Sequence, residues 1–176
     1  MAKIPADWKD AAAGEEQLSY VLYDGQLSTT TANTLLNMFK QTAAANGLKL
    51  TNMTKANELP SNQRFLLKKI ACVFNDTMAA LDVQKLIDDA FFELRINQKL
   101  VLGAPLRLLG PITSLVVPGV TDAIWDYMGP AFELENYLTI PGGTNFAFDL
   151  TTGDTAASAS SRITIELIGD LVRSKN

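Results

Sequence analysis

The feature that constrains this chain most is a two-residue alternation of apolar and polar side chains in its last third. Four of the five even-numbered positions from Phe132 to Ile140 are apolar, and polar residues fill most positions between them. The same alternation returns from Phe146 to Leu150 and from Ile163 to Leu167. Successive side chains of a strand point to opposite faces of its sheet, so this period predicts three strands that each bury one face.

Turn-forming segments separate these three strands. Pro141-Gly142-Gly143-Thr144 follows the first strand, and a loop rich in Gly, Asp, Ser and Ala, residues 151–161, follows the second. No helical crossover lies between the strands, so we expect antiparallel pairing. The predicted fold class is therefore mainly β, an antiparallel sandwich or barrel.

The segment before residue 50 predicts a hairpin and one long helix. Short β-prone runs flank Asp24-Gly25, a pair typical of two-residue turns whose central residues both need positive φ. From Thr31 to Asn46 apolar residues recur at helical spacing, and Gly47 stands where a helix C-cap is expected. We therefore expect a helix at about 31–46 that covers the edge or an end of a sheet.

The middle of the chain predicts two strand regions and a short accessory helix. Arg64 to Phe74 is dense in large apolar and β-branched residues, which favours a strand. Asp82 to Asp89 is long enough for about two helical turns. Phe92 to Ile96 alternates apolar with charged residues, the pattern of a half-buried strand. Leu100 to Leu109 is expected to continue as strand around a kink at Gly103-Ala104-Pro105.

At 176 residues the chain is long enough for one domain with a sizeable core. Residues 1–17 mix Pro, Ala, Gly and charge without a period, so we expect an N-terminal arm that orders against a neighbour. Residues 18–176 are expected to form a single domain containing the inserted helix.

Three aromatic residues in weakly periodic segments are candidate contacts between subunits. Trp8 lies in the expected arm, and Trp125 and Tyr127 lie in a loop bounded by Pro and Gly. Trp and Tyr contribute strongly to the binding energy of protein interfaces. Packing of the loop over the end of a sheet is the alternative interpretation.

Charge and hydropathy argue against two kinds of partner. The formal net charge is −4 and the pI is about 4.8, so the chain lacks the basic surface that nucleic-acid binding requires. The apolar stretch from Leu100 to Val120 is broken by Arg107, prolines and glycines, so we interpret it as buried loop and strand and not as a membrane span. The N-terminus shows no apolar run of the secretory type.

The chain contains no histidine. Without imidazole there is no Ser-His-Asp triad, no Cys-His dyad and no histidine-ligated metal. The single cysteine, Cys72, lies in an apolar run and is interpreted as a small buried hydrophobic residue. Glu133 and Glu135 would stand roughly 6–7 Å apart on a strand, a separation found in glycosidases, but the alternation equally predicts an exposed polar face. We expect no catalytic site, no metal and no cofactor.

Four segments in the last half of the chain carry a resemblance. They are Phe132-Glu133-Leu134, Ile140-Pro141-Gly142-Gly143-Thr144, Phe146 to Leu150, and Arg162 to Gly169. This pattern resembles the closing strands of single jelly-roll capsid proteins of tailless bacterial viruses. The resemblance implies a jelly roll of two packed sheets, standing in an icosahedral shell within a trimeric or pseudo-hexameric capsomer. It also implies that the partners are copies of the chain and other virion proteins, and that the chain reaches the virion after synthesis in the host cytoplasm.

The sequence leaves a second class of function open. A carbohydrate-binding or adhesin-like β-sandwich module of a virion spike or tail would place Trp125 and Tyr127 on a concave face near Asp122 and Asp126. The expected arm, the low charged share of 19% and the missing histidines agree with the structural subunit, and the oligomeric state in solution separates it from this binding module.

Overall fold

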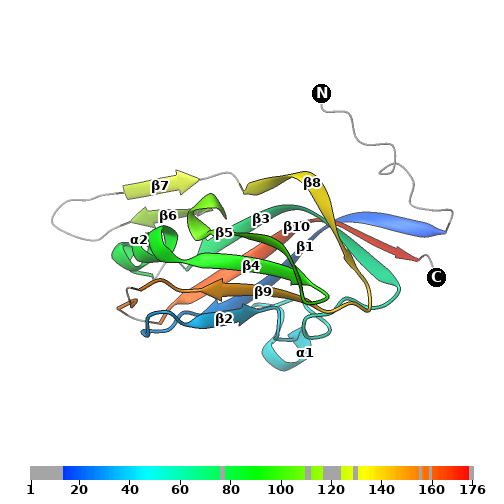
Figure 1. Ribbon diagram of the computed structural model, residues 1–176, viewed down its shortest axis with the longest axis horizontal. Helices are drawn as coiled ribbons and strands as arrows, with labels where there is room; N and C mark the ends of the chain where they lie inside the picture. Colours follow the sequence, from blue (N-terminus) through cyan, green and yellow to red (C-terminus); the bar gives the residue numbers. More distant parts are fainter. Residues whose placement is uncertain are drawn as a thin grey trace.

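The chain is mainly β. The computed structural model describes residues 14–75, 78–109, 112–116, 124–128, 131–154, 156–158 and 160–174. Within these residues, eight strands form two antiparallel four-stranded sheets and two further strands form a small hairpin. The two large sheets lie one against the other in a sandwich-like arrangement (Figure 1).

The first sheet, called sheet A here, contains the long strands. Its order is β1 (Glu15–Leu27), β10 (Arg162–Ser174), β3 (Gln63–Phe74) and β8 (Phe132–Pro141). Each strand runs antiparallel to its neighbours. β1 and β8 are therefore the edge strands of sheet A.

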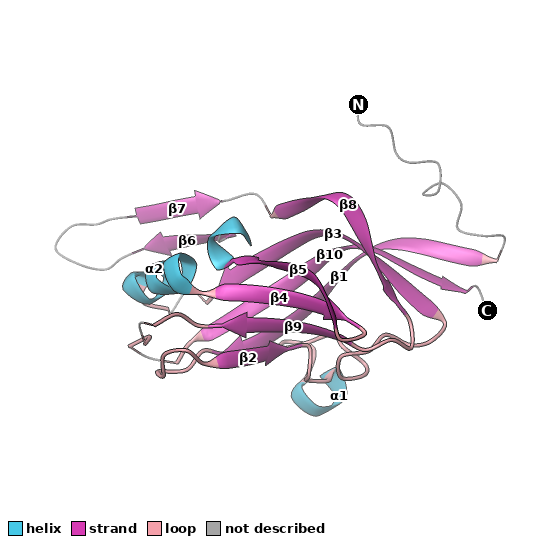
Figure 2. Ribbon diagram, in the orientation of Figure 1, coloured by secondary structure: helices cyan, strands magenta, loops and turns pink. Residues whose placement is uncertain are grey.

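The second sheet, sheet B, contains shorter strands. Its order is β2 (Leu35–Met38), β9 (Phe146–Thr151), β4 (Phe91–Ile96) and β5 (Lys99–Pro105). Because these strands are short, β1 and β10 continue past the end of sheet B, as Figure 2 shows at the side of the C-terminus.

Four of the strand pairings are nested along the chain. β1 pairs with β10, β2 with β9, β3 with β8, and β4 with β5. The additional pairings of β10 with β3 and of β9 with β4 join these pairs into the two sheets. Among the eight strands of the two sheets, only the β4–β5 connection stays within one sheet, and every other connection passes between the sheets.

The remaining elements lie outside the two large sheets. α1 (Ala43–Asn46) follows β2, and α2 (Ala80–Asp89) joins β3 to β4. The 3-10 helix η2 (Leu106–Leu109) follows β5 and contacts α2. β6 (Ile112–Val116) and β7 (Ile124–Met128) pair antiparallel between β5 and β8, and β6 contacts β3.

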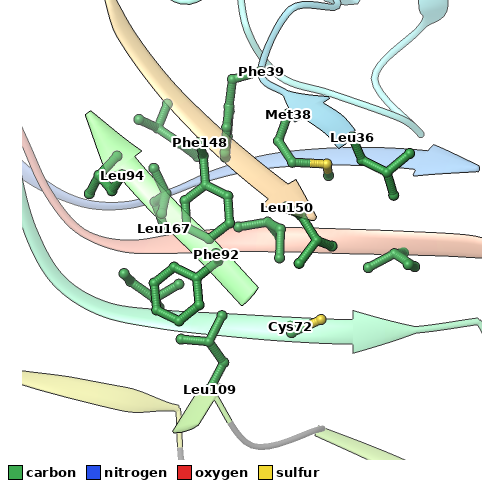
Figure 3. Packing of buried hydrophobic residues seen from close by; sticks show 14 of the residues in the cluster. Leu36, Met38, Phe39, Cys72, Phe92, Leu94, Leu109, Phe148, Leu150 and Leu167 are labelled. Carbon is green, nitrogen blue, oxygen red and sulfur yellow. The ribbon is translucent and has the colours of Figure 1, made fainter. Parts of the chain in front are cut away.

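The two sheets share one hydrophobic core. Sheet B contributes Phe92 and Phe148, whose rings stack at 5.3 Å with an interplanar angle of 2°, and Phe39 meets Phe148 edge-on at 6.4 Å. Figure 3 shows these rings facing Cys72 and Leu167 of sheet A. The inward side chains in the first half of β10 alternate as predicted, and they are Ile163, Ile165 and Leu167.

The strands predicted in the last third are confirmed, but they do not pair with one another. β8 lies in sheet A beside β3, whereas β9 lies in sheet B between β2 and β4. The turn after β8 carries the chain from one sheet to the other. Gly142 permits this passage, because a Cβ at this position would lie 2.1 Å from the carbonyl oxygen of Gln63 and 2.3 Å from that of Pro60.

The helix expected at 31–46 is wrong. The chain forms strand β2 and then only the short α1. In β2 the side chains of Leu36 and Met38 enter the core while Leu35 is half exposed, which is a period of two. Pairing with β9 and burial of this face outweigh the local helical spacing, because propensity is weaker than tertiary packing.

The hairpin expected at Asp24-Gly25 is also wrong. β1 runs straight through both residues, which pair with Ile165 and Thr164 of β10. Gly25 serves a close approach, since a Cβ there would lie 2.9 Å from Oγ1 of Thr164. The two-residue turn with positive φ instead joins β4 to β5 at Asn97 and Gln98, with φ of 51° and 65°.

Other expectations for the first two thirds agree with the structure in part. The strand at 64–74 and the accessory helix at 82–89 are confirmed as β3 and α2. The strand expected over 100–109 ends at Pro105 and continues as η2. Residues 15–17 of the expected arm belong to β1, and residues 1–13, including Trp8, lie outside the described residues.

Replacing Phe92 by Ala tests the shared core. Phe92 is fully buried against Phe148, so we expect Phe92→Ala to lower the free energy of unfolding by about 3–5 kcal/mol. The neighbouring Phe91 is 41% exposed and provides a matched control, for which the loss should be much smaller. Urea unfolding measures both, and equal losses for the two variants would contradict this assignment of the core.

Candidate functional site

The carboxylate pair considered from the sequence lies on an exposed face. Glu133 and Glu135 are both exposed on the edge strand β8, and Glu133 pairs with Lys69 at 3.6 Å. Neither residue lines the groove described below. Their arrangement matches the polar outer face that the alternation of β8 predicts.

Cys72 is buried in the core, as interpreted from the sequence. Burial raises the pKa of its thiol, because the thiolate would be poorly solvated there. A buried thiol with a raised pKa is a poor nucleophile. Cys72 therefore acts as a packing residue.

Three basic residues of β3 are paired with carboxylates. Arg64 donates two hydrogen bonds to Glu15, at 2.7 and 2.8 Å. Lys68 lies 2.7 Å from Asp170, a residue that is 5% exposed on β10, and Lys69 makes the longer contact with Glu133. The positive charges of β3 are thus neutralised locally on the outer face of sheet A.

The structure places two of the three candidate contact residues on one hairpin strand. Trp125 and Tyr127 belong to β7, in register with Leu115 and Thr113 of β6. Trp8 lies outside the described residues, so the structure brings it together with neither of them.

A groove with a volume of about 190 Å³ lies beside the first half of β1, and we call it the β1 groove. One wall consists of Leu18, Tyr20 and Leu22 of β1 together with Leu171 of β10. The opposite wall is formed by the segment between α1 and β3, which contributes Asn52, Met53, Thr54, Glu58, Leu59 and Pro60, and Gln63 and Arg173 complete the lining.

The groove exists because the inner face of β1 passes from the core into solvent. Leu18, Tyr20 and Leu22 share this face, yet Leu22 is 3% exposed whereas Leu18 and Tyr20 are 36% and 37% exposed. The first part of β1, to which Leu18 and Tyr20 belong, is the part of sheet A that extends beyond the strands of sheet B (Figure 2). Apolar side chains that belong to the core pattern are therefore partly exposed.

The outer edge of β1 is covered along only part of its length. Gly25 donates to the carbonyl oxygen of Leu50 at 2.7 Å, and Tyr23 donates to Oδ1 of Asn52 at 3.0 Å. The side chain of Asn52 also donates to the carbonyl oxygen of Val21 at 2.6 Å. Beyond Val21, toward the start of the strand, no other strand among the described residues pairs with this edge.

Asp24 is a buried carboxylate with a structural task. Its Oδ2 accepts hydrogen bonds from the backbone N–H of Phe39 at 2.7 Å and from Gln26 at 3.2 Å, while Oδ1 has no partner among the described residues. Burial raises the pKa of this carboxyl group, and the Phe39 bond offsets part of that rise. Asp24 thereby holds Phe39 at a φ of 64°, with the ring in the core.

Asp82 is a second buried carboxylate, and it ties α2 to the loop before β10. It accepts hydrogen bonds from the backbone N–H and the hydroxyl of Ser158, at 2.9 and 2.5 Å, and lies 3.4 Å from Nζ of Lys85. Burial opposes its ionisation, but the bonds from Ser158 and the charge of Lys85 outweigh burial and lower its pKa.

No protein-family model matches this sequence, and no similar sequence is found among curated proteins. Within the part of the chain that the structure describes, no helix is long and apolar enough to cross a membrane. The same residues include no group of three or more His, Cys, Asp or Glu side chains that could hold a metal ion. The β1 groove is the candidate site considered below, because it combines apolar side chains with an open strand edge.

The two buried carboxylates predict opposite dependences of stability on pH. Asp24 has a raised folded pKa, so the stability of the wild type relative to Asp24→Asn falls as pH rises from about 3.8, the ordinary value, through the raised pKa. Asp82 has a lowered folded pKa, so the stability of the wild type relative to Asp82→Asn falls as pH decreases below 3.8 through the lowered pKa.

Urea unfolding of the three proteins between pH 2 and 7 measures both trends. Asp24→Ala provides a further comparison, because it leaves the buried N–H of Phe39 without an acceptor and should cost about 1–3 kcal/mol at every pH. If the relative stability changed with pH in the same direction for Asp24 and Asp82, the environments assigned to these two carboxylates would be contradicted.

Proposed function

We propose that this chain is a self-assembling structural subunit of a viral shell, built on a jelly roll like the capsid proteins it resembles. The nested strand pairing supports the jelly roll. An antiparallel ribbon that wraps into two sheets pairs its first strand with its last and its second with its next to last. The eight strands of sheets A and B follow this order, with the β6–β7 hairpin as an insertion.

Jelly rolls host several functions, so the site must decide between them. Viral shells, lectins and cupins share this architecture. A chain without histidine has none of the imidazole ligands on which the metal sites of many cupins depend. The choice between a lectin-like module and a shell subunit then depends on which surface is prepared for binding.

The observation that carries the proposal is the open edge of β1 beside the exposed apolar residues of the groove. An uncovered strand edge is a template for pairing with another chain, and natural proteins usually block it. Here the uncovered part carries Leu18 and Tyr20, and Val21 on the opposite face is also 36% exposed. Contact with another copy would cover both the backbone edge and the apolar side chains.

Further support comes from the local neutralisation of charge on sheet A. The basic side chains of β3 are held by Glu15, Asp170 and Glu133, so this strand offers little uncompensated positive charge to nucleic acid. This outer face of sheet A, with its charges paired, is compatible with a subunit that contacts copies of itself and other virion proteins. Its proposed location is the virion.

Replacing Leu18 by Lys tests the assembly. Placing a charge in the groove removes one buried leucine contact, about 1.5–3 kcal/mol, so half-assembly should need about tenfold or more protein. Size-exclusion chromatography with light scattering measures the assembled fraction, and negative-stain microscopy shows whether the wild type forms shells or regular arrays. Leu81→Lys on α2, where the side chain is 75% exposed, is the matched control and should assemble normally.

A wild-type chain that stays monomeric at every concentration would contradict the proposed function. A monomer that binds glycans would instead favour the carbohydrate-binding module. Urea unfolding of Leu18→Lys checks that the variant remains folded, because Leu18 lies at the solvent end of the inner face.

A further inference from the structure

We propose that the β1 groove receives the N-terminal segment, residues 1–13, of a neighbouring copy, which adds an extended strand to the open edge of β1. This inference rests on the proposed self-assembly and names the segment that makes the contact. It uses strand addition, in which backbone hydrogen bonds hold the added peptide and every second side chain enters a pocket.

The edge of β1 defines where such a strand fits. The outward backbone groups at Val21, Tyr23 and Gly25 are taken by residues 50–52. Because outward groups alternate along a strand, the backbone of Gln17 and Ser19 faces the same side. Among the described residues, no strand other than β10 pairs with this part of β1. The site therefore admits a strand of about five residues, which ends where Asn52 closes the edge.

The groove supplies the pockets for its side chains. A strand beside Gln17 and Ser19 would direct alternate side chains to the inner face, next to Leu18 and Tyr20. Across the groove the wall is apolar at Met53, Leu59 and Pro60. The site accordingly favours an extended peptide with large apolar residues at alternate positions.

The N-terminal segment has such a pattern. If residues 4–8 are extended, Ile4, Ala6 and Trp8 share one side, while Pro5 and Asp7 lie on the other. The charged residues of the groove lining are already paired within the chain, Glu58 with Lys55 at 3.1 Å and Arg173 with Glu16 at 2.9 Å, so the apolar positions carry the match. An aromatic residue such as Trp8 is a typical anchor in an interface pocket.

The length of the segment permits contact between copies. Residues 9–13 separate the apolar positions from Gly14 and β1, and five extended residues span about 17 Å. This spacer lets the segment leave its own strand and reach the groove of the next copy. Each copy would then give a segment and receive one, a head-to-tail contact that continues from copy to copy.

Disulfide trapping tests the contact in the full chain. The native Cys72 is buried and does not compete. Protein carrying Ala6→Cys is mixed with protein carrying Leu18→Cys under assembly conditions and oxidised. We expect a disulfide-linked dimer in most of the assembled material. Asp7→Cys mixed with Leu18→Cys is the matched control, because Asp7 lies on the other side of the extended segment, and should give at least about fivefold less dimer.

Ser19→Pro tests whether backbone pairing holds the segment. The N–H of Ser19 faces the open edge, where proline is tolerated within a sheet. We expect Ser19→Pro to unfold at a similar urea concentration to the wild type but to lose assembly. When it is combined with Leu18→Cys, the disulfide with Ala6→Cys should no longer form. Unchanged trapping in Ser19→Pro would overturn strand addition.

The outcomes separate this inference from the proposed function. If the wild type forms shells but the mixed cysteine variants give no 6–18 disulfide, or give equal amounts of dimer from positions 6 and 7, the inference is overturned and self-assembly stands. A disulfide formed within one chain of a double variant, Ala6→Cys with Leu18→Cys, and absent from the mixture also overturns it. A wild type that remains monomeric by light scattering overturns both.

Discussion

The burial of one face of sheet A against one face of sheet B is the interaction on which the rest of this structure depends. Phe92 and Phe148 stack in sheet B and pack toward Cys72 and Leu167 in sheet A (Figure 3). Neither sheet could bury its apolar face alone. The contact between the two sheets therefore keeps the strands in place at both ends of every connection that crosses between them. Asp24 supports it from within by holding Phe39 at positive φ with its ring in the core.

The same contact creates the candidate site through a mismatch in length. The strands of sheet A have 10 to 13 residues, whereas the strands of sheet B have four to seven. Where sheet B ends, the inner face of β1 keeps its apolar pattern but loses its cover, so Leu18 and Tyr20 border a groove. The buried core and the β1 groove are thus lined by two parts of the same alternating face of β1.

Local patterns predicted elements well where alternation was strong, as in β8, β9 and β10. They failed where a local signal was overruled. The segment with helical spacing at 31–46 forms β2 because Leu36 and Met38 are buried beside β9. Asp24 and Gly25 lie within β1 because β10 pairs with this strand along its whole length. The groove had no sequence signal beyond the apolar residues of β1, since its opposite wall comes from the segment at 52–60.

The sequence by itself determined the β character, the inward and outward faces of each strong strand, the burial of Cys72 and the absence of imidazole chemistry. These properties follow from side-chain period and composition, which are local. Only the tertiary structure decided that β8 and β9 belong to different sheets, that β1 pairs with β10, and that the start of β1 has an open edge. Those features arise from contacts between residues far apart in the chain, and no local period encodes which strand will be the neighbour.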